Sequence, residues 1–121
     1  MISLKLTPNE FKALILFVRG VVDMQSRLPI RNQQLSGLVL EQYLGKWRPH
    51  QLLAWGQRTA GKEFKLNLSL PVAKALHQEM QHSVLMGWQQ LLLGKLDQAL
   101  INYQIPLLES VPVITFRYGS N

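Results

Sequence analysis

The segment 56–63, with the sequence Gly-Gln-Arg-Thr-Ala-Gly-Lys-Glu, comes close to a phosphate-binding P-loop. Its two glycines and Lys62 stand at P-loop spacing, in which backbone N–H groups hold phosphates and the lysine neutralises them. The final position is Glu63 instead of Ser or Thr, and a carboxylate there repels phosphates and offers magnesium no hydroxyl. An alternating strand pattern also follows the segment, where a P-loop needs a helix. We therefore interpret 56–63 as a turn.

Three side chains that can bind metals, those of His77, Glu79 and His82, lie close together in a stretch with helical periodicity. Two histidines on one helix share an ion best at a spacing of four. Here the spacing is five, which separates them by about 140° around the helix. The sequence has seven carboxylates and no second Glu–His pair of this kind. We predict solvent-facing residues here, with no metal site and no cofactor.

Catalytic motifs are missing from the sequence. It contains no cysteine, which excludes cysteine nucleophiles, disulfides and thiolate metal sites. Neither the nucleophile elbow of hydrolases nor the glycine fingerprint of dinucleotide-binding enzymes is present. We predict that the protein is not an enzyme, and no small-molecule substrate is evident.

Positive charge is concentrated in the first half of the sequence. The net charge is +6 over 121 residues, and residues 1–65 hold ten Lys or Arg against four Asp or Glu. The densest stretch, 42–62, has four basic residues, no acidic residue and several aromatic residues. Cations beside aromatic rings can neutralise phosphates and stack on bases. The predicted nucleic-acid-binding residues are Lys46, Trp47, Arg48, His50, Arg58 and Lys62.

The same stretch has a second interpretation, which the sequence leaves open. Tryptophan is large and is usually mostly buried. Tyr43, Trp47 and Trp55 can therefore be anchors of the core or of an interface, with the cations as their solvated rim.

Two glycines in the second half indicate a different kind of surface. Gly87 and Gly94 are seven residues apart and so lie on one face of a helix, where small residues let a second helix approach closely. Trp88 and Leu91 lie beside them. The sequence predicts an interface formed by Gly87, Trp88, Leu91 and Gly94. The alternative is that the glycines end or kink helices.

Hydrophobic periodicity predicts the elements that position these residues. Alternating apolar residues predict strands at about 2–6, 63–70 and 111–118. Helical spacing predicts helices at about 8–25, 31–45, 49–57 and 71–104. Gly87 and Gly94 are possible points of division of the last helix, and Ile105-Pro106 is expected to end it.

These elements predict an α+β fold that is mainly helical, with four to five helices and a small three-stranded sheet. Residues 1–121 are expected to form a single compact domain. Leu4, Leu6 and Leu14 recur as Leu66, Leu68 and Leu76, which suggests a strand–helix unit duplicated over 2–25 and 64–86. The alternative is convergence, because any strand that enters an amphipathic helix has this pattern.

The sequence therefore predicts a small non-enzymatic interaction or adaptor module. We expect it to self-associate through apolar helices, as a homo-oligomer or with a protein partner. The alternative is a basic nucleic-acid-binding module that uses 46–62. No apolar stretch approaches the roughly 20 residues of a membrane span, and no signal peptide is recognisable, so we expect a cytoplasmic protein without membrane contact.

Overall fold

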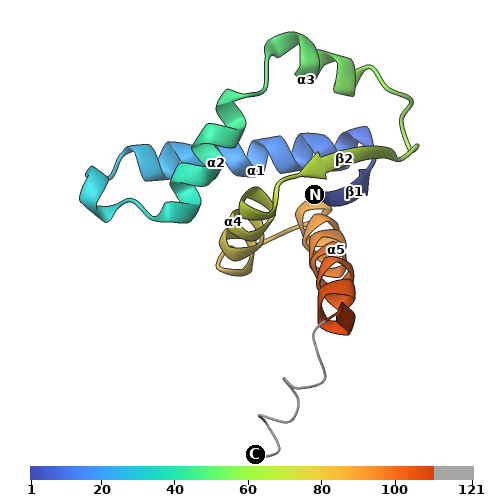
Figure 1. Cartoon of the computed structure of the whole chain (residues 1–121). Helices are drawn as coiled ribbons and strands as arrows, with labels where there is room; N and C mark the ends of the chain where they lie inside the picture. Colours follow the sequence, from blue (N-terminus) through green and yellow to red (C-terminus); the bar gives the residue numbers. More distant parts are fainter. Residues whose placement is uncertain (111–121) are drawn as a thin grey trace, which may run out of the picture.

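The computed structural model describes residues 1–110 and has five α-helices around a small sheet (Figure 1). In chain order the elements are β1 (Ile2–Leu6), α1 (Pro8–Ser26), the 3-10 helix η1 (Ile30–Asn32), α2 (Leu35–Gly45), α3 (Pro49–Gly56), β2 (Phe64–Leu68), α4 (Leu70–Gln81) and α5 (Trp88–Ser110). The mainly helical α+β class is confirmed. The predicted third strand, 111–118, lies outside the described residues. Within residues 1–110 no helix has the length and apolar character needed to cross a membrane.

The sheet consists of β1 and β2, which pair antiparallel with Leu4 opposite Leu66. Along each strand the apolar side chains alternate with polar ones, and the apolar set faces the core. Strand β2 is shorter than the predicted 63–70, because Ser69 already caps the next helix. Its hydroxyl accepts a hydrogen bond from the Val72 N–H at 3.5 Å.

Helix α1 begins where the sequence predicts, at a capping box. The Thr7 hydroxyl accepts from the Glu10 N–H at 3.3 Å, and the Thr7 N–H donates to Glu10 Oε1 at 2.9 Å. Pro8 occupies the first turn, where its missing donor costs little. Buried residues of α1 pack under the sheet and against α2 and α5. The helix is therefore the central element of the core.

The long helical pattern predicted over 71–104 forms two helices, α4 and α5. The chain turns between them at Gly87, whose φ of +56° favours glycine. Gly94 lies inside α5 and does not divide it. The predicted end at Ile105-Pro106 is wrong, since α5 continues to Ser110. A proline removes one backbone donor and bends a helix without always ending it.

The predicted helix at 31–45 also starts later than expected. A single 3-10 turn, η1, comes first, and Gln33 and Gln34 have extended backbone before α2 begins at Leu35. The short helix predicted at 49–57 is confirmed as α3.

The two segments that resemble each other in sequence also have similar local structures. Each consists of a strand, a hydroxyl N-cap and a helix, with Thr7 and Ser69 in equivalent positions. Leu4 and Leu66, which are equivalent in the alignment, lie directly opposite each other in the sheet. A duplication remains a hypothesis that is compatible with this arrangement.

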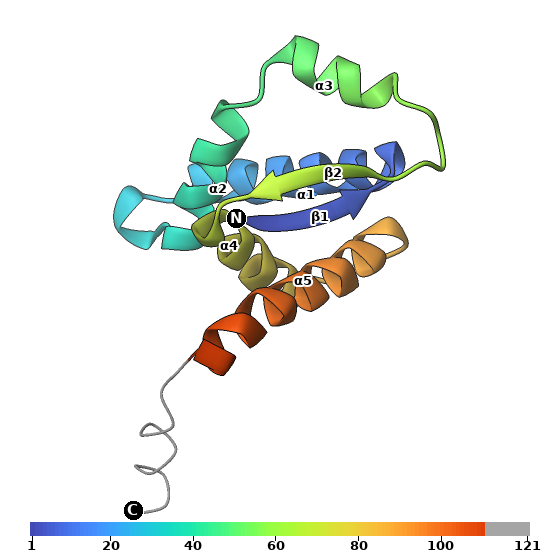
Figure 2. The ribbon, with the colours of Figure 1, turned by 45° about the vertical axis from the view of Figure 1, so that its right-hand side comes forward.

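A cluster of aromatic rings fastens α3 to the rest of the molecule. Trp55 stacks on Phe11 of α1 with ring centroids 4.2 Å apart and planes 11° from parallel. Trp47 meets the same Phe11 ring edge-on at 5.1 Å, and Phe64 of β2 meets Trp55 at 6.2 Å. Figure 2 shows α3 above the sheet, on the side opposite to α5.

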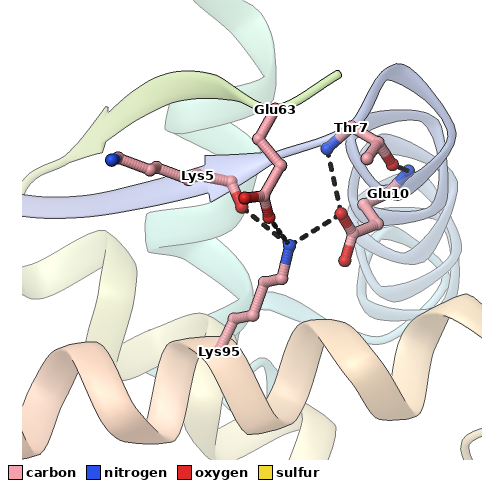
Figure 3. A network of polar contacts seen from close by, with 5 residues as sticks. All are labelled: Lys5, Thr7, Glu10, Glu63 and Lys95. Atoms are coloured by element: carbon pink, nitrogen blue, oxygen red, sulfur yellow. Dashed lines mark hydrogen bonds and ion pairs between the residues drawn. The ribbon is translucent and has the colours of Figure 1, made fainter. Parts of the chain in front are cut away.

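The ammonium group of Lys95 joins α5 to β1 and to the start of α1 (Figure 3). Its Nζ donates to the Lys5 carbonyl at 2.8 Å, to Glu10 Oε1 at 2.8 Å and to Glu63 Oε2 at 2.6 Å. These three bonds use all three donors of the ammonium group. They join α5 to β1, to the start of α1 and to the chain just before β2.

Burial and pairing act in opposite directions on the charges in this network. Burial alone would raise the pKa of Glu10, but the hydrogen bonds from Lys95 and Thr7 outweigh it and the pKa is lowered. Burial alone would lower the pKa of Lys95, but Glu10 and Glu63 outweigh it and the pKa is raised. Both groups are therefore charged at neutral pH.

Replacing Lys95 should destabilise the protein through Glu10. Lys95→Met leaves a carboxylate whose side chain is 4% exposed without its cation. We expect a loss of about 2–3 kcal/mol, at the lower edge of buried pairs because Lys95 itself is partly exposed. In Glu10→Gln/Lys95→Met the loss should be smaller than the sum of the two single losses by about 1 kcal/mol. Urea unfolding of the four proteins measures this, with the exposed Lys74→Met as control. Additive losses would contradict the coupling.

The cost of Lys95→Met should also depend on pH. The pKa of Glu10 is lowered by folding, so its contribution is complete above the ordinary value of 4.5 and is lost as the pH falls through the lower folded pKa. Once Glu10 is protonated it has no charge for Lys95 to pair. Urea unfolding at about pH 7 and about pH 3 should therefore show a smaller difference between wild type and variant in acid. An equal difference at both pH values would argue against this account.

Candidate interaction surfaces

The residues predicted to bind nucleic acid are divided between the core and the surface. Lys46, Arg48 and His50 are exposed around the start of α3. Trp47 is partly buried, and its ring meets the Phe11 ring edge-on within the aromatic cluster. Stacking on bases requires an aromatic ring that is free on the surface. Trp47 is packed against Phe11 and is not such a ring.

The two remaining cations of this set lie over aromatic rings. The Arg58 guanidinium is 4.2 Å from the Trp55 ring and 4.7 Å from the Phe64 ring. Lys62 lies 6.0 Å from the Phe64 ring. The ion pairs among residues 1–110 include none of the six predicted residues. Their charge is thus exposed, as the second interpretation of the sequence also expects.

Sequence analysis missed one pair of basic residues. Lys5 and Lys65 are sixty positions apart, but the sheet register places them directly opposite each other on the exposed face. Like charges in this position destabilise a sheet slightly and strengthen the local positive field. The alternating pattern places each lysine on the polar face of its strand. The strand register, which the sequence does not give, places the two lysines opposite each other.

The other motifs that could do chemistry have separate structural partners. Segment 56–63 follows a helix and precedes a strand, which is the reverse of P-loop order. His77 Nε2 lies 3.0 Å from Asp97 Oδ1, and Glu79 accepts from the Ser36 hydroxyl at 2.6 Å. In the described part of the chain no three potential metal ligands come together.

The four predicted interface residues lie together at one end of α5. Gly87 precedes its first residue, Trp88, which is 49% exposed, and Leu91 is 55% exposed. Gln98 and Ile101 continue the line at helical spacing and are exposed as well, which the sequence analysis did not predict. We call this outward line the α5 stripe. It consists of Gly87, Leu91, Gly94, Gln98 and Ile101.

The α5 stripe carries no charge. Between residues 88 and 104 the exposed side chains include one charged group, Asp97, and it is bonded to His77. Lys95 is turned towards Glu10 and Glu63. Helices on the surface of a protein ordinarily place charged residues opposite the core. The outer face of α5 therefore differs from the rest of this basic protein.

Nothing in the described part of the chain requires glycine at position 94. Gly94 lies inside a helix, where glycine costs about 1 kcal/mol relative to alanine. A Cβ atom built there would have no atom within 4 Å apart from the helix itself. The position is open space on the outside of α5, as a close approach by another molecule requires.

Comparison with known proteins identified no relative, since no family model, no curated protein and no solved structure matches the chain.

Proposed function

We propose that this protein is a non-enzymatic interaction module that self-associates through the α5 stripe. The observation that carries the proposal is a helix face that has exposed Leu91 and Ile101 and no charged side chain, on a protein of net charge +6. Leu91 and Ile101 provide exposed apolar surface, and Gly94 between them leaves room for a second helix to lie close.

Electrostatics favours this face over other faces for contact between two copies. Each copy carries six surplus positive charges, so most ways of bringing two copies together place cations opposite cations. Contact through the α5 stripe does not. It also buries no unpaired charge, which would cost several kcal/mol.

The geometry of α5 supports the same contact. Residues seven apart remain on one face of a helix, so Gly94 and Ile101 lie in one line along α5, and Gly87 directly precedes the helix. Packed helices lie about 8–10 Å apart, and glycine at the crossing point permits the shorter distance. The Lys95 bonds and the buried Leu92 and Leu96 fix the rotation of α5, so the stripe is presented without reorganisation.

The exposed apolar residues near the end of α1 are less suited to contact between identical copies. Met24, Leu28 and Ile30 lie near the end of α1, but Arg27 and Arg31 stand among them. Gly20 is as open as Gly94, but its neighbour Arg19 has no ion-pair partner among residues 1–110. The charged neighbours of Gly94 are both bonded, Lys95 to Glu10 and Glu63 and Asp97 to His77.

Replacing members of the α5 stripe should weaken self-association. Leu91→Gln removes apolar surface and Gly94→Gln fills the space for a second helix, and neither changes the charge. We expect each to raise the dissociation constant of the oligomer at least about tenfold. Sedimentation equilibrium over roughly 5–500 μM protein measures this constant.

Two matched variants control for the chemistry of these substitutions. Leu35→Gln changes a leucine that is 76% exposed on α2, and Gly20→Gln changes an open glycine inside α1. Both should leave the association unchanged. A wild-type protein that stays monomeric at the highest concentration would contradict the proposal, as would equal weakening by the control variants.

Binding of nucleic acid through 46–62 is the second candidate, supported by exposed cations without ion-pair partners among the described residues. The sequence predicts that charge reversal at Lys46, Arg48, Arg58 and Lys62 abolishes it. Anisotropy of labelled duplex and single-stranded nucleic acid at about 50 and 200 mM salt tests this. Micromolar binding that weakens steeply with salt would support phosphate contacts. Binding that survives the four reversals would remove this segment as the site.

A further inference from the structure

An open groove runs between α1 and α3, on the side of the sheet opposite to α5 (Figure 2). Its volume is about 460 Å³, and ten residues line it. The floor and walls are largely apolar, formed by Phe11, Ile15 and Leu16 of α1 and by Leu52 and Leu53 of α3. Nothing in residues 1–110 covers two of these leucines, since Leu16 is 53% exposed and Leu53 is 62% exposed.

All charged residues that line the groove are basic. Lys12 and Arg19 stand on its α1 wall, and none of the ten lining residues is acidic. Neither cation takes part in an ion pair with any described residue. The groove therefore combines apolar surface with two available positive charges.

The cations and the exposed leucine on α1 have a regular spacing. Lys12, Leu16 and Arg19 follow one another at four and three residues, so they lie along one line of the helix. Seven residues correspond to two helical turns, or about 10.5 Å along the axis. A helix lying along α1 would meet this line with acidic side chains two turns apart and an apolar side chain between them.

The groove is built before any partner arrives. Phe11 in its floor is held between the Trp55 and Trp47 rings, and the same stack fixes the distance of α3 from α1 at that point. A partner therefore does not need to order the groove, which lowers the cost of binding.

We propose that the α1–α3 groove binds an acidic amphipathic helix of a partner protein. Its leucine-type side chains enter between α1 and α3, and its carboxylates pair with Lys12 and Arg19. This mode of recognition is that of a helix in an apolar groove, with charge setting the choice of partner. The groove and the α5 stripe lie on opposite sides of the sheet, so a self-associated module could hold a partner on each copy.

A designed peptide serves as the probe. It is a labelled helix of about 18 residues with Leu at every third and fourth position and Glu on both flanks. One comparison peptide has Lys in place of every Glu, and another has Ser in place of every Leu. Anisotropy should show saturable binding of the Glu–Leu peptide, and at least about tenfold weaker binding of each comparison peptide. Chemical shifts of backbone amides in the full chain should change at residues 12–19 and 52–56.

Variants of the protein locate the site. Lys12→Glu/Arg19→Glu should weaken the Glu–Leu peptide at least about tenfold and should favour the Lys peptide. Leu53→Gln changes an exposed side chain and should weaken both the binding and the shift changes while leaving the unfolding midpoint unchanged. Arg31→Glu/Lys74→Glu makes the same change of charge elsewhere on the surface and should leave peptide binding intact.

Several outcomes would overturn the proposal. These are no saturable binding of the Glu–Leu peptide up to about 1 mM, equal binding of the Ser version, and tighter binding of dodecanoate than of the peptide. The first would leave the groove without this partner, the second would indicate a general polyanion surface, and the third would indicate an anionic lipid-like ligand. None of the variants lies in the α5 stripe, so failure here is separable from failure of self-association.

Discussion

A buried carboxylate at the start of α1 imposes the constraint on which the arrangement of the helices depends. Glu10 closes the capping box with Thr7, and its residue is 3% exposed. A charge at that depth is tolerated only with a partner. Lys95 supplies it from a position 85 residues further along the chain. The local requirement for a helix cap therefore becomes a long-range tie between α1 and α5.

The tie also determines what α5 shows to solvent. Once Lys95 is bonded to Glu10, Glu63 and the Lys5 carbonyl, the rotation of the helix is fixed. Leu92 and Leu96 then face the core, and Leu91 and Gly94 face outwards. The face opposite the core is the one without charge, so the ion network and the proposed interface are two consequences of a single orientation.

On the other side of the sheet the Phe11 ring has a comparable role. Stacking on Trp55 holds α3, and contact with Trp47 holds the connection from α2. Aromatic rings used in this way are not available to nucleic-acid bases, which weakens the stacking part of the alternative function. The same packing leaves a space between α1 and α3 that is lined by apolar residues and two cations.

Local patterns were sufficient to predict most elements of this fold. The capping box placed the start of α1, and alternation placed both described strands. Of the predicted interface residues, Trp88, Leu91 and Gly94 lie on α5, whereas Gly87 lies in the turn before it, as the alternative interpretation of the glycines expects. The predicted end of α5 at Pro106 was wrong, because a single proline weakens a helix without determining where it stops.

Features that depend on distant residues could not be predicted. The pairing of Glu10 with Lys95, the opposition of Lys5 and Lys65, and the groove between α1 and α3 each require the tertiary arrangement. The basic stretch 42–62 shows the limit most clearly. Its composition fits both a nucleic-acid surface and an aromatic anchor with a charged rim. Tertiary packing buries Trp55 in the core and leaves the cations exposed. Composition alone does not predict which of these residues are buried.

The two surfaces differ in charge, and this difference accounts for the different partners that we propose for them. Copies of one protein carry the same net charge, so contact between them is favoured where that charge is absent, as it is along the α5 stripe. A different protein can use the opposite sign, and the cations beside the α1–α3 groove favour one that does. Because the sheet lies between the two surfaces, occupation of one does not block the other. Under the two proposals, the surplus of basic residues limits self-association to one face and selects acidic partners at the other.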